Sequence, residues 1–191
     1  MWGRFNPQGV ESVPTIDIPT IDTERLTLRV PRREDFEEAF EMWGDPKVTR
    51  YIGGKPSTRE EMWARLLRYV GHWDLMGYGF WVVREKSTGR FVGEVGLADF
   101  RREIEPSFEG AKEAGWVLSP WAQGKGFATE AVSAALRWAD SRFGPERVVC
   151  IIDLGNEASV KVAHRCGFRE FARGSYKGEP VNMLERIPGA R

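Results

Sequence analysis

The sequence lacks the marks of a membrane, secreted or metal-binding protein. No stretch approaches about 18 consecutive apolar residues, and the first residues lack the apolar core of a signal peptide. The two cysteines, Cys150 and Cys166, lie in apolar surroundings, and the cysteines and the two histidines are scattered without metal-ligand spacing. We therefore expect buried free thiols, no metal, no contact with a membrane and a cytoplasmic location.

An excess of charge of one sign is missing as well. Basic and acidic side chains are equal in number, 28 of each, so no global field exists to attract nucleic acid. With 41% hydrophobic and 29% charged residues, a chain of 191 residues is typical of one globular domain with a substantial core. We expect an irregular tail over residues 1–20, docked through Trp2 or Phe5, and one domain over residues 21–188.

Apolar periodicity predicts a single α/β domain without internal repeats. Strands are expected at 26–30, 80–83, 91–97, 113–118, 148–152, 168–173 and 181–187. Helices are expected at 36–43, from Ser57 onward, at 129–143 and after Asn156. Ser57 and Glu60 fit a capping box for the second helix, whose apolar face would be Trp63, Leu66, Leu67 and Val70. The charged segment 101–112 is predicted to be an exposed loop.

Residues 113–130 carry most of the functional information. An apolar strand-like run ends at Ser119-Pro120, a turn with two glycines follows, and a helix comes next. Gly124 and Gly126 allow the turn to curl so that several N–H groups point into one concavity, beside the free N–H groups of the helix. Such donors suit a diphosphate. A plain strand-to-helix turn would have the same short glycine pattern.

Flanking motifs resemble one family in both content and order. Residues 123–128, Gln-Gly-Lys-Gly-Phe-Ala, match its phosphate-binding motif, and Asn156 with Cys166-Gly167-Phe168 matches a second motif. The chain thus resembles the GNAT superfamily of acyl-CoA-dependent N-acyltransferases. Ser159 and the opening Thr-Glu-Arg-Leu-Thr-Leu-Arg at 23–29 are most similar to the ribosomal-protein N-terminal (Rim-type) acetyltransferase branch.

The resemblance implies a central mixed, mostly antiparallel sheet flanked by helices, with strands splayed at the cofactor site. It also implies acetyl-CoA as the acetyl donor, with its diphosphate on the 123–129 amides and its pantetheine arm along 116–118. Asn156 and Ser159 would contact the pantetheine, and Arg165 the ribose phosphate. The implied cofactor-binding residues are Trp116, Val117, Leu118, Gln123, Gly124, Lys125, Gly126, Phe127, Ala128, Thr129, Asn156, Ser159 and Arg165. The N–H of Val117 or Leu118 would polarise the thioester carbonyl.

Acetyl transfer requires a neutral amine, so a base must accept a proton. Glu113, on the same strand as the thioester contacts, is the first candidate, and Glu94 is the second; a water chain is a third option. Many family members carry a tyrosine as the acid that protonates the leaving thiolate, but Ala163 stands at that position here. The resemblance suggests Ser159 as its replacement.

Tyr51 and Tyr176 are the candidate acceptor-binding residues, since they fall in segments that border the acceptor groove in this family. The branch resemblance favours a protein N-terminal amine as the acceptor. A small amine, aminoglycoside-like or polyamine-like, is an alternative substrate, and a catalytically weak acyl-CoA-binding protein is an alternative function. The resemblance is compatible with a homodimer.

Overall fold

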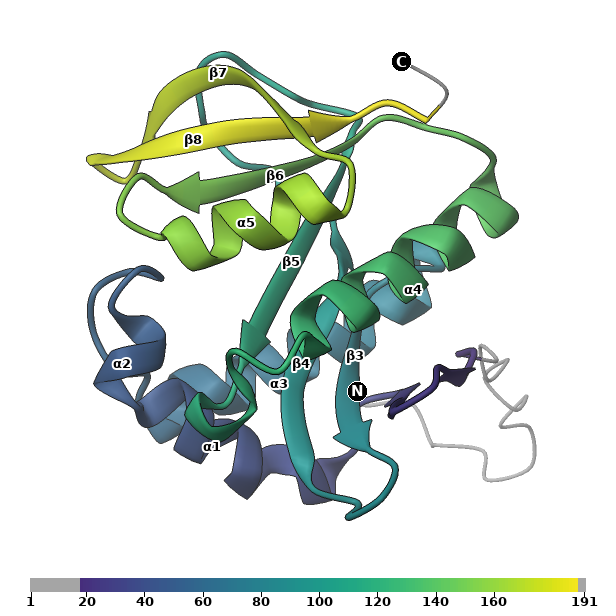
Figure 1. Cartoon of the computed structure of the whole chain (residues 1–191). Coiled ribbons are helices and arrows are strands. Elements are labelled where there is room, and N and C mark those ends of the chain that lie inside the picture. Colours follow the sequence, from purple (N-terminus) through teal and green to yellow (C-terminus); the bar gives the residue numbers. More distant parts are fainter. Residues whose placement is uncertain (1–17, 189–191) are drawn as a thin grey trace, which may run out of the picture.

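The computed structural model describes residues 18–188, which form the mixed α/β domain expected (Figure 1). Most of the predicted tail, including Trp2 and Phe5, lies outside the described residues. The strands are β1 Ile21–Asp22, β2 Leu26–Arg29, β3 Phe80–Glu85, β4 Phe91–Ala98, β5 Lys112–Leu118, β6 Val148–Asp153, β7 Arg169–Tyr176 and β8 Glu179–Arg186. The helices are α1 Phe36–Gly44, α2 Pro46–Thr49, α3 Arg59–Met76, α4 Phe127–Phe143 and α5 Glu157–Arg165, with short 3-10 helices η1 Arg33–Asp35 and η2 Pro120–Ala122.

The predicted order of strands and helices is confirmed, with small additions. The patterns did not predict β1 or α2, each of four residues or fewer, because so short a segment has no measurable period. The helix expected from residue 129 begins earlier, at Phe127, since Gly126 already serves as its N-cap. Among the described residues, no helix is both long and apolar enough to cross a membrane.

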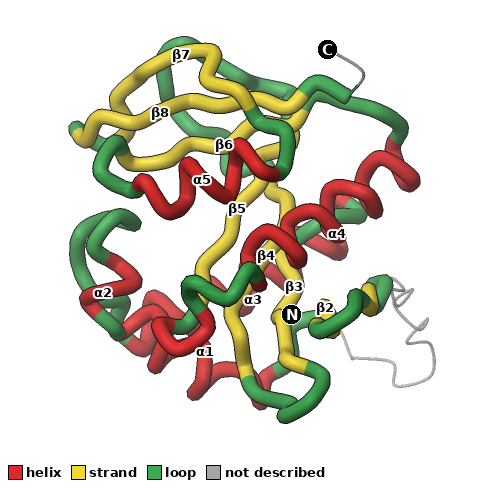
Figure 2. Tube along the Cα trace, in the orientation of Figure 1, coloured by secondary structure: helices red, strands yellow, loops and turns green. Residues whose placement is uncertain are grey.

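One eight-stranded sheet runs through the domain in the order β1-β2-β3-β4-β5-β6-β8-β7. Neighbouring strands are antiparallel except β5 and β6, which are parallel. Figure 2 shows β5 crossing the middle of the molecule, with β6, β7 and β8 on one side of it and β3 and β4 on the other. The sheet is therefore mixed and mostly antiparallel, as predicted.

The parallel pair β5–β6 is joined only where its strands begin. Lys112 pairs with Val148 and Glu113 with Val149, and no later residue of β5 pairs with β6. From Ala114 to Leu118, β5 keeps its partners on β4 alone. The expected splay between two central strands is thus present at this pair.

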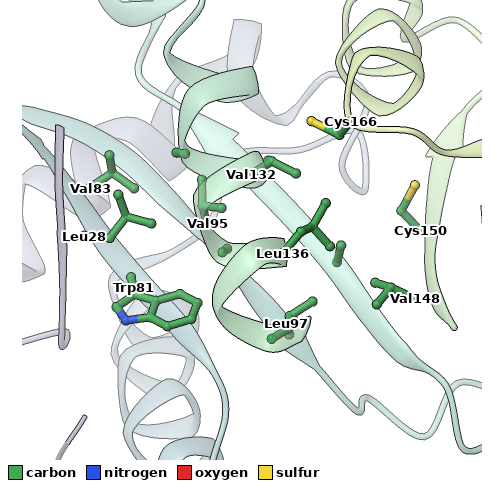
Figure 3. Packing of buried hydrophobic residues seen from close by; sticks show 14 of the residues in the cluster. Leu28, Trp81, Val83, Val95, Leu97, Val132, Leu136, Val148, Cys150 and Cys166 are labelled. Carbon is green, nitrogen blue, oxygen red and sulfur yellow. The ribbon is translucent and has the colours of Figure 1, made fainter. Parts of the chain in front are cut away.

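The main core lies between the sheet and α4 with α5 (Figure 3). Val132, Ala135, Leu136 and Ala139 of α4 are buried, as their helical spacing predicted. They contact alternate residues of the strands, such as Leu28, Val95 and Val148. A smaller cluster joins α1 and α3 to the opposite face of the sheet, through residues including Val82 and Val117.

Three tryptophans join the two sides of the core beside the start of β3. The rings of Trp73 on α3, Trp81 on β3 and Trp138 on α4 meet edge to face, with centroids 4.7 to 5.5 Å apart. Trp73 also donates its indole N–H to the Phe80 carbonyl at 2.9 Å. This junction fixes α3 against the strand that begins four residues after the helix ends.

The buried face of α3 differs from the predicted one. Its buried residues are Met62, Leu66, Tyr69 and Trp73, whereas Trp63, Leu67 and Val70 are 41 to 53% exposed. Apolar residues occur on two overlapping stripes of this helix, and polar bonds of Tyr69 and Trp73 to the sheet decide between them. The capping box is also one residue later, formed by Thr58 and Glu61.

The loop that follows β4 was predicted to be exposed, and this is wrong for part of it. Ile104 and Phe108 are 7% and 8% exposed and pack against Val149, Val181 and Met183. The loop thereby covers the face of β6 and β8 that α5 leaves open. Two apolar side chains among many charges were too few to give a periodic signal.

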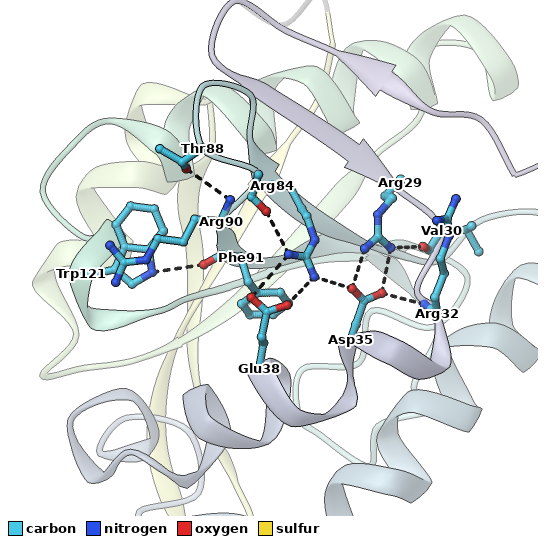
Figure 4. A network of polar contacts seen from close by, with 11 residues as sticks. Arg29, Val30, Arg32, Asp35, Glu38, Arg84, Thr88, Arg90, Phe91 and Trp121 are labelled. Atoms are coloured by element: carbon cyan, nitrogen blue, oxygen red, sulfur yellow. Dashed lines mark hydrogen bonds and ion pairs between the residues drawn. The ribbon is translucent and has the colours of Figure 1, made fainter.

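A buried carboxylate fixes the start of α1 to the sheet (Figure 4). Asp35 is fully buried, and its oxygens accept hydrogen bonds from Arg29 on β2 and Arg84 on β3. Arg84 also reaches Glu38 on α1. The hydrogen bonds from the two arginines and from the Arg32 amide outweigh the desolvation of Asp35, so that its pKa lies below the usual range.

The close approach of β4 and β5 yields a test of the fold. Gly93 has φ +154°, and a Cβ there would stand 2.1 Å from the Val117 carbonyl oxygen and 2.8 Å from the Leu118 Cα. We expect Gly93→Ala to lower the free energy of unfolding by about 1–3 kcal/mol, because the backbone would have to move. Gly71, inside α3, has no atom within 4 Å of such a Cβ, so Gly71→Ala should stabilise by about 0.5–1 kcal/mol. Urea unfolding of both variants measures these changes, and an unaffected Gly93→Ala protein would contradict the pairing.

Candidate active site

The turn between β5 and α4 presents a run of free amides. Gly124 and Gly126 adopt left-handed φ angles of +76° and +80°. Among the backbone hydrogen bonds of residues 18–188, none is donated by the amides from Gly124 to Thr129; the first paired amide is that of Glu130, which donates to the Gly126 carbonyl. Gln123, Lys125 and the two glycines are exposed, so a ligand can reach this turn. We call residues 123–129 the amide cradle, and its donors fit a diphosphate.

The turn between β1 and β2 braces the amide cradle and the start of α4 from outside. Arg25 donates from its Nη1 to the Lys125 carbonyl at 2.9 Å and from its Nε to Glu130 at 2.7 Å. Thr23 and the Arg25 amide also bond the Glu130 carboxylate. The Arg25 guanidinium lies 4.7 Å from the centre of the Phe127 ring. Residues 23–25 thus determine the shape of a turn a hundred residues later.

The edge of β5 beyond the splay supplies further donors. The Ser119 amide bonds the Val92 carbonyl on β4 at 2.9 Å. Because successive amides of a strand point to opposite sides, those of Leu118 and Trp116 point to the side from which β6 has diverged. The Leu118 carbonyl accepts a bond from the Gln123 side chain at 3.1 Å. Of the two amides considered for the thioester carbonyl, only that of Leu118 faces the gap.

The beginning of α5 forms the other side of the gap. Asn156 caps this helix, accepting from the Ser159 amide at 3.1 Å, and its side-chain NH₂ is not used in that bond. Ser159 is half-buried on the first turn, and Arg165 is exposed at the last turn. Tyr51, from the α2–α3 connection, packs against the loop before α5: a Cβ on Gly155 would lie 3.0 Å from the Tyr51 Cε1 atom.

A buried carboxyl group is carried by β4, at the position that pairs with Val117 on β5. Glu94 is 1% exposed, and its Oε2 accepts bonds from the Trp43 indole N–H at 2.8 Å and the Tyr69 hydroxyl at 3.2 Å. Its Oε1 is buried without a hydrogen-bond partner among the described residues. Desolvation raises the pKa of Glu94, although these bonds and the charge of Arg65 oppose the shift. A carboxyl group with a raised pKa is suited to exchange protons near neutral pH.

Glu113 has a different environment, at the start of β5. It is 5% exposed and forms a bidentate ion pair with Arg102, at 2.5 and 2.7 Å. Four residues of extended strand, about 13 Å, separate it from Val117. Arg102 also lies 4.5 Å from the centre of the Tyr176 ring, so Tyr176 and Glu113 belong to one neighbourhood.

The structure brings the predicted residues together in two groups. The amide cradle, Leu118, Asn156 and Ser159 surround the splay, with Tyr51 at its border. Glu113 and Tyr176 lie at the far end of β5. Sequence reasoning missed Trp43 and Tyr69 as partners of Glu94, and it missed Arg25; only the Thr23–Arg29 motif pointed to that segment. Among residues 18–188, no group of His, Cys, Asp or Glu is placed to hold a metal ion.

Comparisons with known proteins agree with this arrangement. The profile of the family described as "Acetyltransferase (GNAT) domain" matches residues 25–169. The chain is 30% identical to YkkB of Bacillus subtilis over 86% of this chain and 93% of that protein. It is 28% identical to the N-acetyltransferase p20 of Bacillus licheniformis over 79% of this chain and 83% of the relative.

Solved structures show the same fold. A GnaT-family acetyltransferase from Bordetella pertussis has a TM-score of 0.79 and 31% identity, covering 89% of this chain and all of that one. The ribosomal L7/L12 alpha-N-protein acetyltransferase RimL, in complex with coenzyme A, has a TM-score of 0.71 at 19% identity, covering 88% and 98%. A Vibrio cholerae spermidine N-acetyltransferase, in complex with CoA and spermine, has a TM-score of 0.68 at 19% identity, covering 86% and 96%.

The raised pKa of Glu94 predicts how stability depends on pH. Because the folded protein holds this proton more tightly than the unfolded chain, the stability contributed by neutral Glu94 is present below the ordinary value of 4.5 and is lost as pH rises through the raised pKa. Relative to Glu94→Gln, which cannot ionise, the native protein should lose about 1.4 kcal/mol per pH unit in that interval. Urea unfolding from about pH 5 to 8 measures this difference.

The exposed glutamate of the same region provides a control. Glu60 lies in the first turn of α3. The assignment of this pH dependence to Glu94 would be contradicted in either of two cases. In the first, Glu60→Gln changes the pH dependence of the unfolding free energy as Glu94→Gln is expected to do. In the second, the unfolding free energy of Glu94→Gln varies with pH as that of the native protein does.

Proposed function

The chain belongs to the GNAT family of acetyltransferases, and on that premise we propose that it transfers the acetyl group of acetyl-CoA to the N-terminal amine of a protein. One observation carries the proposal: β5 joins the two parts of the site, because its Val117 pairs with the buried Glu94 on β4, its end leads into the amide cradle, and its other edge is left free where β6 diverges. The Thr23–Arg29 and Asn156–Ser159 motifs, which resemble the Rim-type branch, support a protein acceptor.

In this proposal the amides of residues 124–129 bind the diphosphate of the cofactor, and Arg25 holds their turn in shape. The exposed edge of β5 at Trp116–Leu118 pairs with the peptide-like pantetheine arm, as an added strand would. Asn156 offers its free side-chain NH₂ to the same arm. Bound acetyl-CoA supplies a thioester whose carbonyl carbon the amine attacks. The Leu118 amide donates to the carbonyl oxygen as negative charge develops there.

The proton of the attacking amine goes to Glu94, either directly or through one water. The unpartnered Oε1 of Glu94 is the acceptor, while Trp43 and Tyr69 hold Oε2 in place. We favour Glu94 over Glu113 for two reasons. Both oxygens of Glu113 are in the Arg102 ion pair. Glu113 also lies about 13 Å along β5 from Val117, the residue that pairs with Glu94. Ser159, on the first turn of α5, is the proposed proton donor to the departing thiolate.

The acceptor class is tested by turnover. The protein should release CoA thiol when acetyl-CoA is mixed with peptides that carry a free N-terminal amine, and the product should be acetylated at that amine. Gly126→Glu should weaken acetyl-CoA binding by roughly a hundredfold or more, because a carboxylate would stand among the phosphate-binding amides. Gly77→Glu is the matched control, since Gly77 has φ +70° and no atom within 4 Å of a Cβ but caps α3.

Three outcomes would contradict this proposal. Turnover with polyamines or aminoglycosides, but with no peptide, would show that the acceptor is a small amine and not a protein N-terminus. Tight CoA binding without transfer to any amine would identify a binding protein. Equal CoA affinity in Gly126→Glu and native protein would remove the amide cradle from the site.

The base is tested by comparing two isosteric variants. Glu94→Gln should lower kcat by about 10²–10⁴-fold with the dissociation constant of acetyl-CoA unchanged. In the native protein kcat should fall as pH falls through the raised pKa of Glu94, and this acidic limb should be absent from the residual activity of the variant. Glu113→Gln should act mainly on stability, since it leaves the partly buried Arg102 without its ion-pair partner. A larger loss of kcat in Glu113→Gln than in Glu94→Gln would reverse the assignment.

A further inference from the structure

The side of β5 that faces α3 carries an excess of positive charge. Arg65 and Arg68 lie one turn apart on α3, and Arg102 lies in the loop after β4. Within residues 18–188, neither Arg65 nor Arg68 has a carboxylate within ion-pair distance. Glu113 has both oxygens engaged by Arg102, and Glu94 is buried against Trp43 and Tyr69. We call Arg65, Arg68 and Arg102 the arginine group.

Aromatic rings lie against all three guanidinium groups, and for Arg65 and Arg68 they take the place of an ion-pair partner. The Arg65 Cζ lies 3.7 Å from the centre of the Trp43 ring, and its Nε is buried without a hydrogen-bond partner. Arg68 and Arg102 both lie against Phe100, at 5.4 and 4.8 Å. Partial burial and the neighbouring charges of Arg65 and Arg102 lower the pKa of Arg68, so the three cations repel one another. An anion between them would relieve this repulsion.

The arginine group follows the path from the reacting centre along β5. Arg65 lies over the Trp43 ring, and the indole N–H of Trp43 donates to Glu94. Arg102 lies beside Glu113, four strand residues further on, or about 13 Å. An extended peptide spans about 3.3–3.6 Å per residue, so its first four residues would cover this path. Arg68 is exposed, as a binding residue must be.

We propose that the acceptor is an acidic protein N-terminus, with carboxylate side chains within about the first four residues, bound by Arg68 and the free donors of Arg65. This inference rests on the proposed function and narrows its substrate class. An arginine fork recognises a carboxylate through two parallel hydrogen bonds, which gives specificity as well as affinity. The same charges disfavour a polyamine, whose ammonium groups would meet guanidinium groups without a carboxylate to balance them.

The test compares three peptides that share an N-terminal serine. Positions two to four are Glu-Asp-Glu in the first, Gln-Asn-Gln in the second and Lys-Gln-Lys in the third. With the native protein, kcat/KM should be at least about tenfold higher for the acidic peptide than for its amide counterpart, and lowest for the basic one. The advantage should shrink as salt is raised, because the sites are partly exposed.

Substitution of Arg68 connects the preference to the arginine group. Arg68→Gln should reduce the acidic-to-amide ratio by about tenfold, mainly through KM, with acetyl-CoA affinity unchanged. Arg137→Gln is the matched control, since Arg137 is an exposed arginine on α4 and on the opposite side of the sheet. Its ratio should equal that of the native protein.

The outcomes separate this inference from the function on which it rests. Equal turnover of the three peptides, or a ratio that Arg68→Gln leaves intact, would overturn the acidic acceptor while leaving N-terminal acetylation in place. No turnover of any peptide, with polyamine turnover present, would overturn both. A preference for the basic peptide would reverse the inference directly.

Discussion

The early end of the β5–β6 ladder is the constraint on which the rest of the molecule depends. After two residue pairs the strands diverge, and the backbone groups of β5 on that side have no strand to bond. Helices follow both strands, so the N-terminus of α4 and the N-terminus of α5 border one opening at the carboxyl ends of two parallel strands. This is the position at which open α/β sheets bind ligands. The amide cradle, the Leu118 amide and Asn156 are all consequences of the same divergence.

The stability of β4 and the chemistry of the site are coupled through adjacent residues. Gly93 lets β5 approach so closely that no side chain fits, and Glu94 follows it into a buried position under α1 and α3. Burying a carboxyl group among Trp43, Tyr69 and apolar residues destabilises its ionised form. The two hydrogen bonds offset part of that cost. The fold therefore keeps a buried carboxyl group with a raised pKa at the expense of stability.

The sequence predicted the parts of the molecule that depend on local pattern. The order of elements, the buried stripe of α4 and the 123–128 motif all arise from neighbours in the chain, and the structure confirms the elements. The pairing of Arg25 with Glu130, or of Trp43 and Tyr69 with Glu94, joins residues that are 25 to 105 positions apart and leaves no periodic trace. The buried face of α3 was mispredicted for a related reason. Two stripes were apolar, and tertiary hydrogen bonds selected one of them.

The tryptophan junction of α3, β3 and α4 has an optical consequence. Trp73, Trp81 and Trp138 are held with their rings close to perpendicular, at interplanar angles of 63 to 86°. Aromatic chromophores at such distances couple their electronic transitions. In a rigid asymmetric arrangement this coupling produces a signal in near-ultraviolet circular dichroism. The signal requires all three elements to be docked at once. It therefore reports tertiary assembly around β3, away from the opening between β5 and β6.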